Sequence, residues 1–472
     1  MTSTAKHHDL KLAFYGDDFT GSTDALEVLA FGGLRCALFL SVPSTAQLAA
    51  LGGFDAIGVA GSSRAMSPDE MDAELPDVLN GLAALAPQIV HYKVCSTFDS
   101  APTVGNIGRV IELSRSAFPQ ALVPIVASTP ALGRYCLFGN LFARSGTDGE
   151  VYRIDRHPIM SVHPVTPMQE SDVALHLRKQ APLAIGNVHL TMLDTASPAD
   201  LVDYIGDMAP SRQAVVIDGM SPEHLTTTGD CLQRMASRLE APLFVVGSSG
   251  VEYALTQSWQ HEKRESSALP ADSYGTFGAV DQVLVVSGSA SKLSAMQIEA
   301  ALDAGFHEVA IDAEGLTIGP DTAAAEARLV SEVVSALASG ASVVMHTALG
   351  PSDPRVVRLI QGLQVRGCSL EQARLQSARM VSERLGIVVD AIVRRHRLRR
   401  LVLSGGDTSS RITQALGPDA LEIRARLAPG APLCAVLSSA THLSGLELAL
   451  KGGQMGATDY FVRALQGSAA AA

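Results

Sequence analysis

Two adjacent carboxylates, Asp17 and Asp18 (hereafter the acid pair), follow an apolar run and a glycine in the stretch "FYGDDFTGSTDA". We expect Thr20 or Ser22 to cap a helix that begins near Gly21, because hydroxyl side chains satisfy free backbone N–H groups there. Capping leaves the acid pair unexplained. Neighbouring carboxylates repel, so their loop needs cations, hydroxyl donors or water. A solvated turn and a polyol or metal site are both consistent with this stretch alone.

Other loops of the N-terminal half supply cations directly after strand-like runs. Ser63 and Arg64 follow "AIGVAG", Lys93 ends "IVHYK", and Arg134 lies in "STPALGRYC". The carboxyl ends of parallel strands meet at one edge of a sheet, where ligands bind. We therefore expect Lys93, Arg64 and Arg134 to hold a carboxylate, while the acids and hydroxyls bind sugar hydroxyl groups.

The C-terminal half contains three small-residue turns, hereafter the glycine loops, that resemble phosphate-binding turns. Two of them join a strand-like run to a helical pattern, which presents backbone N–H groups to an anion. No G-x-x-x-x-G-K-[ST] motif occurs, and no G-x-G-x-x-G follows a strand. The candidate phosphate-binding residues are Ser287 and Ser289, then Gly405, Gly406, Asp407 and Thr408, and finally Gly452 and Gly453.

The elements that must position these residues alternate between short strands and helices, which predicts an α/β fold with mainly parallel sheets flanked by helices. A chain of 472 residues is too long for one ordinary core. The polar stretch 260–282 is the best linker, so we predict domains at residues 1–262 and 280–472.

Composition excludes several classes of protein. The net charge of −12 and the absence of a long basic run argue against nucleic acid as a partner. The six cysteines are scattered, which is typical of reduced thiols, and no signal peptide or membrane-spanning run is visible. We expect a soluble, cytoplasmic protein; a homodimer is compatible with the sequence.

The motif "GDDFTGSTDA" resembles the signature D-D-x-T-G-x-x-D of the four-carbon acid sugar kinase family. The resemblance continues in the family's order through "HPVTPMQESD", "VVGSSG", "SGSAS", "SGGDT", "PGAP" and "KGGQMG". It implies a sugar-acid-binding N-terminal domain, a nucleotide-binding C-terminal domain and an active site in the cleft between them. Such kinases use ATP and Mg²⁺ to phosphorylate a terminal hydroxyl of threonate, erythronate or 3-oxo-tetronates.

The resemblance also implies roles for individual residues. We favour Asp18 over Asp17 as the group that activates the attacking hydroxyl, and no side chain is predicted to bind a metal directly. Nucleotide contacts fall on the glycine loops. Sugar-acid contacts fall on Asp17, Asp18, Thr20, Ser63, Arg64 and Lys93.

Two departures from the family pattern lie in the substrate half. Many members have K-x-D-S-T-L-R-G where this chain has "KVCSTFDSAP", so Cys95 replaces an aspartate; "VAGSSR" also differs from D-T-x-S-R. A branched relative such as 3-oxo-isoapionate is therefore a candidate substrate. The alternatives are a kinase for another polyol, an NAD-linked sugar-acid dehydrogenase, and a non-catalytic sensor of the sugar acid or nucleotide.

Overall fold

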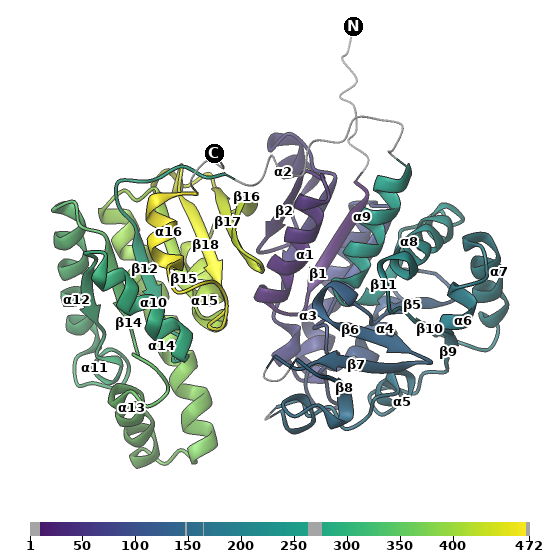
Figure 1. The fold of residues 1–472 in the computed structure, drawn as a ribbon, viewed down its shortest axis with the longest axis horizontal. Helices are drawn as coiled ribbons and strands as arrows, with labels where there is room; N and C mark the ends of the chain where they lie inside the picture. The colour runs from purple at the N-terminus through teal and green to yellow at the C-terminus, as the bar shows by residue number, and fades with distance from the viewer. Residues whose placement is uncertain (1–9, 147–148, 164, 263–275, 469–472) are drawn as a thin grey trace, which may run out of the picture. The chain divides into compact units, whose positions relative to one another are not determined.

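The chain divides into two units, Met1–Pro270 and Ala271–Ala472, which are described separately (Figure 1). The computed structural model describes residues 10–146, 149–163, 165–262 and 276–468. Most of the predicted linker, 260–282, falls outside the described residues, so the predicted domain boundaries remain a prediction.

A wholly parallel sheet forms the centre of the N-terminal unit. Its strands are short apolar runs, and most are buried at every position, as expected when helices cover both faces. In spatial order they are β2 (Cys36–Phe39), β3 (Ala56–Ala60), β1 (Leu12–Gly16), β4 (Ile89–Lys93), β11 (Leu243–Gly247), β5 (Val123–Val126), β10 (Ala214–Ile217) and β9 (Ile185–Val188).

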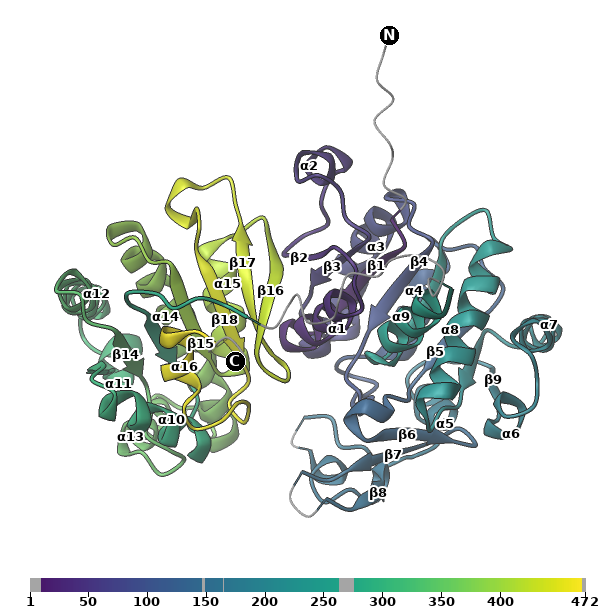
Figure 2. The same ribbon diagram turned by 45° about the horizontal axis from the view of Figure 1, so that its top comes forward.

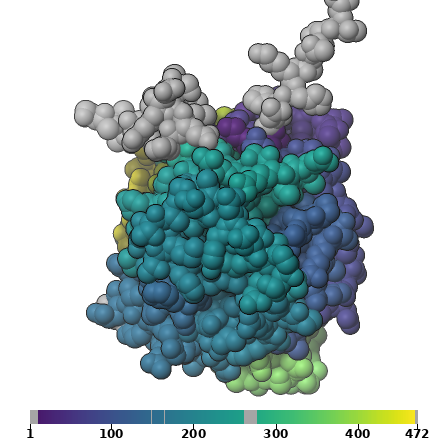
Figure 3. All heavy atoms as spheres, turned by 90° about the vertical axis from the view of Figure 1, so that its right-hand side faces the viewer, coloured from purple at the N-terminus to yellow at the C-terminus, as the bar shows by residue number. Residues whose placement is uncertain are grey.

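Helices form a layer on each face of this sheet (Figure 2). Three of them start with Ser-Pro, the serine capping the helix and the proline occupying its first turn. In Figure 3 the teal atoms of the segment that carries α7 to α9 form most of the visible face. One row contains α1 (Phe19–Phe31), α9 (Gly250–Glu262), α8 (Pro222–Ser237) and α7 (Pro198–Met208); the other contains α3 (Pro68–Ala84), α4 (Ile107–Ser114) and α5 (Val173–Arg178).

A small antiparallel sheet and two short helices complete the N-terminal unit. The carboxylate of Asp218 anchors this sheet, because it accepts hydrogen bonds from the backbone N–H groups of Phe138 (2.5 Å) and Gly139 (2.9 Å) at its first turn. The strands are β6 (Arg134–Leu137), β7 (Asn140–Arg144) and β8 (Val151–Arg153), and the helices are α2 (Thr45–Ala50) and α6 (Leu190–Leu193).

The sheet of the C-terminal unit is parallel in one part and antiparallel in the other. Gly430, with φ +68°, forms the turn of the antiparallel hairpin that follows the parallel strands. The parallel strands are β13 (His307–Ala310), β14 (Val343–His346), β12 (Leu284–Ser287), β15 (Arg400–Ser404) and β18 (Glu447–Lys451); β17 (Ala431–Leu437) and β16 (Ala420–Ala428) continue the sheet.

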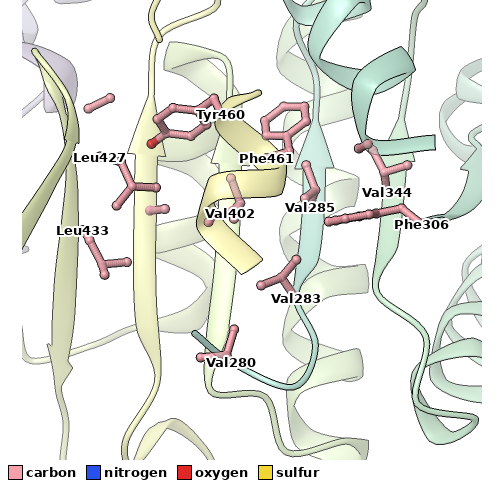
Figure 4. Packing of buried hydrophobic residues seen from close by; sticks show 14 of the residues in the cluster. Val280, Val283, Val285, Phe306, Val344, Val402, Leu427, Leu433, Tyr460 and Phe461 are labelled. Carbon is pink, nitrogen blue, oxygen red and sulfur yellow. The ribbon is translucent and has the colours of Figure 1, made fainter. Parts of the chain in front are cut away.

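One hydrophobic cluster of this unit lies between the sheet and a thin helical layer. Tyr460 and Phe461 pack against Val285 and Val402 of the sheet (Figure 4). The layer consists of α10 (Lys292–Asp303) and α16 (Tyr460–Gln466), and the remaining helices are α11 (Ala313–Thr317), α12 (Thr322–Ala338), α13 (Pro354–Val365), α14 (Leu370–Arg395) and α15 (Gly406–Leu416).

The predicted fold class is confirmed: two α/β units, each with a mainly parallel sheet flanked by helices. Within the described ranges, no helix combines the length and apolar character that crossing a membrane requires.

Candidate functional site

The acid pair lies in the turn between β1 and α1. Asp18 caps the helix, since its Oδ1 accepts a hydrogen bond from the backbone N–H of Gly21 at 2.8 Å. The helix begins at Phe19, so the prediction that Thr20 or Ser22 caps a helix starting near Gly21 is wrong. The hydroxyl of Ser22 instead donates to the carbonyl of Asp18, inside the first turn.

The guanidinium of Arg64 lies across both carboxylates. It bonds Asp17 through Nε (3.1 Å) and Nη2 (2.7 Å), and Asp18 through Nη1 (2.8 Å) and Nη2 (3.0 Å). This fork uses the planar donors that distinguish arginine from lysine. The side chain of Asp17 is only 6% exposed, whereas that of Asp18 is 30% exposed. Asp18 is therefore the member of the pair that a ligand can reach.

One cation serves two acids in this cluster. Burial raises the pKa of Asp17, with Arg64 opposing that shift and Asp18 adding to it. Burial alone would lower the pKa of Arg64, but the charges of Asp17 and Asp18 raise it. Arg64 thus stays protonated, and with both acids ionised these three groups together carry a net negative charge, before Lys93 is counted.

Lys93 supplies a second positive charge on the other side of Asp18. It ends β4, is 2% exposed, and donates from Nζ to the carbonyl of Val94 at 2.9 Å. A Cβ atom on Gly21 would lie 3.0 Å from this Nζ and 2.4 Å from Oδ1 of Asp18. The absence of a side chain at Gly21 therefore lets the ammonium approach the acid pair.

Ser63 and Thr20 take different places around the pair. Ser63 is fully buried, and its hydroxyl shares a 2.7 Å hydrogen bond with that of Tyr92, whose ring stacks on Tyr15 at 5.8 Å. It supports the loop that carries Arg64. Thr20 is exposed at the start of α1, and in the part of the chain that the structure describes its hydroxyl has no protein partner.

Arg134 begins β6 in the small sheet and contacts the preceding turn. Its Nη1 donates to the carbonyl of Leu132, and its backbone pairs with Thr129. Thr129 in turn shares a 2.6 Å hydrogen bond with Ser248 at the end of β11. The structure brings Asp17, Asp18, Arg64 and Lys93 into one cluster; it shows no ion pair between Arg134 and that cluster among the described residues.

Sequence reasoning missed the polar residues that α9 and β4 place beside Lys93. His91 and Glu252 are fully buried and form a pair with Nδ1 and Oε1 2.6 Å apart. Asp24 of α1 is close enough to Lys93 for that cation to oppose the rise that burial causes in its pKa. The sequence did contain a signal for Glu252. In "VVGSSGVE" this acid stands in the first turn of a helix that follows a buried strand.

Cys95 lies at the rim of the same cluster. Its Sγ is 3.0 Å from the hydroxyl of Thr97, which donates to Asp99 at 2.6 Å. Burial and the charge of Asp99 raise the pKa of Cys95 to about 11, with Arg64 opposing the rise. The side chain is therefore a neutral thiol at neutral pH.

In the C-terminal unit the three glycine loops begin side by side, at the carboxyl ends of three adjacent strands. Ser287 pairs with Ser404 across β12 and β15, and Ser404 pairs with Lys451 across β15 and β18. Gly405 has φ +111°, which only glycine adopts without strain, and caps α15 without a side-chain hydrogen bond. The first N–H groups of α15 are thus free for an anion.

The loops border a cavity of about 440 Å³. Its second wall consists of apolar residues of α13 and α14, among them Leu359 and Val381, with Arg374 alongside. Phosphate-binding loops opposite an apolar wall suit a nucleotide, whose base is flat and apolar on its faces. The predicted residues that line this cavity are Ser289, Gly405, Gly406, Asp407, Thr408 and Gly453; Ser287 and Gly452 lie just outside it.

A larger hollow of about 800 Å³ lies in the N-terminal unit, at the end of its sheet that is opposite to the acid pair. It is lined by residues 86–88, 236–237 and 239–242, together with Asp230, Gln233 and Arg234. It contains none of the predicted site residues. The smaller cavity is the better nucleotide site, because the carboxyl ends of its strands supply the loops.

Comparison with protein families assigns both units. A family model described as a sugar-binding N-terminal domain matches residues 12–255, and one described as a nucleotide-binding C-terminal domain matches residues 284–461. The chain belongs to the four-carbon acid sugar kinase family. The resemblance inferred from the motifs is thereby confirmed, and the protein is a kinase.

Relatives of known name span the whole chain. It is 40% identical over 470 residues to the 3-oxo-isoapionate kinase of Paraburkholderia graminis, covering 100% of this chain and 97% of the relative. It is 28% identical to the 3-oxo-tetronate kinase of Cupriavidus necator, covering 99% of each. A solved structure from Salmonella typhimurium LT2 shares the fold, with a TM-score of 0.76 at 22% identity over 96% of this chain and 98% of its own.

Proposed function

We propose that this protein is an ATP-dependent kinase that phosphorylates a terminal hydroxyl of a small sugar acid. Its first candidate substrate is a branched 3-oxo acid such as 3-oxo-isoapionate. The observation that carries the proposal is the full-length similarity to a 3-oxo-isoapionate kinase, together with the neutral Cys95 beside the acid pair. Plain four-carbon acids such as threonate, erythronate and 3-oxo-tetronate are the second choice.

The acid pair divides two tasks in this proposal. Asp18 accepts or orients the proton of the attacking hydroxyl, because it is the more accessible carboxylate. Asp17 accepts hydrogen bonds from Arg64 on both of its carboxylate oxygens and thereby fixes the guanidinium in place. The positive charges of Lys93, Arg64 and Arg134 hold the substrate carboxylate. Lys93 is only 2% exposed, so it acts through its charge and not by direct contact.

The cavity of the C-terminal unit receives ATP. Its glycine loops and the N-terminus of α15 bind the phosphates, and the wall formed by α13 and α14 receives the base. Mg²⁺ would neutralise the charge of the ATP phosphates when ATP is bound. Among the described residues no cluster of three potential metal ligands exists, and Asp407 is the one carboxylate among those lining the cavity. Asp407 is therefore the residue of this cavity that would contact the ion.

Transfer requires the γ-phosphate to contact the hydroxyl, so the proposal requires the two sites to face each other during turnover. Closure around them excludes water and limits wasteful hydrolysis of ATP.

A coupled assay of ADP release tests the proposal. Purified protein and Mg-ATP are mixed with a panel of C4 to C6 sugar acids that includes 3-oxo and branched acids. Turnover on one or two of them supports the kinase. ATP binding without turnover on any of them would favour the sensor, and reduction of NAD by a sugar acid would favour the dehydrogenase.

A further inference from the structure

Lys451 is a buried cation without an anionic partner. It ends β18, is 2% exposed, and its Nζ donates to the hydroxyl of Ser404 at 2.9 Å. The rings of Tyr460 and Phe461 lie 5.9 and 5.7 Å from Nζ. No carboxylate among the described residues forms an ion pair with it. Burying an ammonium in this way is costly unless a charge compensates for it.

A hydrogen-bond network connects this lysine to the glycine loops. The hydroxyl of Ser404 lies 3.5 Å from that of Ser294, which donates to the carbonyl of Gly453 at 3.1 Å. The backbone N–H of Gly405 donates to the carbonyl of Lys451 at 3.0 Å. Lys451 therefore lies directly beneath two of the loops that border the cavity.

Burial lowers the pKa of Lys451 from 10.5 to about 8. Tyr460 is the titratable side chain that faces it from α16. Glu447, at the other end of β18, is occupied by Arg400 at 2.6 Å. The other charged groups on the neighbouring elements are Arg463 of α16, Asp407 and Arg411 of α15, and Lys292, Glu299 and Asp303 of α10. Of these, Asp407 lines the cavity, and Lys292 is exposed.

We infer that Lys451 is a positioning residue for the nucleotide, whose ammonium stabilises the bound phosphates from beneath the glycine loops and is fully protonated only when they are present. This inference rests on the proposed function. The bound phosphates supply the negative partner for the ammonium of Lys451. The low-dielectric surroundings strengthen the attraction between the phosphates and the ammonium. By linkage, ATP binding must then take up protons near the pKa of the free lysine.

Titration calorimetry of Mg-ATP binding at pH 8, in two buffers that differ in ionisation enthalpy, tests the inference. A lysine with a pKa of about 8 is half protonated there, so wild type should take up about 0.5 proton per ATP bound. Lys451→Met should abolish that uptake and weaken binding by at least about tenfold. Lys451→Arg should retain much of the affinity without proton uptake, because arginine is always charged.

Lys179→Met is the matched control, because it removes the same charge from an exposed helix end of the N-terminal unit. It should leave both affinity and proton uptake unchanged. Wild-type binding without proton uptake, unaltered in Lys451→Met, would overturn this inference and leave the kinase proposal intact. Failure of wild type to bind ATP would overturn both. If Lys451→Met fails to fold, the comparison of wild type with Lys451→Arg still tests the inference. Proton uptake by wild type that is lost in Lys451→Arg supports it, and equal uptake by both proteins would overturn it.

Discussion

Arg64 holds Asp17 through two separate nitrogens, with Nη2 2.7 Å from Oδ1 and Nε 3.1 Å from Oδ2. Arg64 also bonds both oxygens of Asp18, but the side chain of Asp17 is 6% exposed and that of Asp18 is 30% exposed. The two acids are adjacent in sequence but differ in availability, and the assignment of their roles depends on that difference.

Replacing Asp18 by Asn should reduce kcat by about 100-fold or more while leaving the Kd for ATP nearly unchanged. The amide can still cap α1 but cannot accept the proton of the hydroxyl. Steady-state kinetics and ATP titration of the same preparation measure both values. Near-wild-type kcat in a correctly folded variant would remove Asp18 from the mechanism.

Cys95→Asp should shift substrate preference by at least about tenfold in kcat/KM from a branched 3-oxo acid toward a linear four-carbon acid. The change places a carboxylate near Arg64 and Asp99, where the thiol is neutral. Cys95→Ser is the control for size, and its preference should stay close to that of wild type. Equal preferences in the Asp variant and wild type would show that Cys95 does not select the substrate.

Gly406→Val should weaken ATP binding by at least about tenfold, because its side chain would project at the start of α15, where the cavity lining exposes free N–H groups. The matched control is Gly206→Val in α7, where an added Cβ meets nothing within 4 Å. Calorimetry should show normal ATP affinity for the control. Unchanged ATP affinity in Gly406→Val, with normal melting, would count against the cavity as the nucleotide site.

The stability of the protein should fall below pH 6.5 partly because of His176. Burial, with a smaller contribution from Lys179, lowers the pKa of His176 from 6.5 to about 4. The unfolded chain takes up this proton near pH 6.5 and the folded chain only near pH 4. The unfolded state therefore binds more protons in between, and stability that is complete above pH 6.5 is lost as the pH falls.

Between pH 7 and pH 5 this effect amounts to about 2 kcal/mol. In urea unfolding, the free energy of unfolding should change between pH 7 and pH 5 by about that amount less in His176→Gln than in wild type. His189→Gln, at an exposed position, should keep the wild-type dependence. Identical pH dependences in all three proteins would contradict the assignment to His176.

The sequence predicted the cluster around the acid pair well, because strand ends determine where loops meet. Arg64 and Lys93 lie 46 and 75 positions after Asp18, yet Arg64 follows β3 and Lys93 ends β4, and both of these strands pair with β1. Parallel pairing then places them beside Asp18 without further information. The helix start was predicted too late, because Gly21 was taken as a boundary although Asp18 caps the helix and accepts a hydrogen bond from the backbone N–H of Gly21.

Other features depend on packing that the sequence does not display. The apolar wall of the cavity beside the glycine loops comes from α13 and α14, and residues such as Leu359 and Val381 resemble ordinary core positions. The antiparallel hairpin that turns at Gly430 interrupts an otherwise parallel sheet, and the alternation of strands and helices in the sequence did not predict it. The burial of Lys451 likewise follows from the rings that α16 places over it.

The most direct test of the central claim is transfer of a labelled phosphoryl group. Protein is incubated with γ-labelled ATP, Mg²⁺ and 3-oxo-isoapionate, and ADP, labelled sugar acid and labelled inorganic phosphate are quantified together. We predict labelled sugar acid in equal amount to ADP, with formation reduced by Asp18→Asn and by Gly406→Val. Release of the label only as inorganic phosphate, or no turnover with any acid of the panel, would contradict the account.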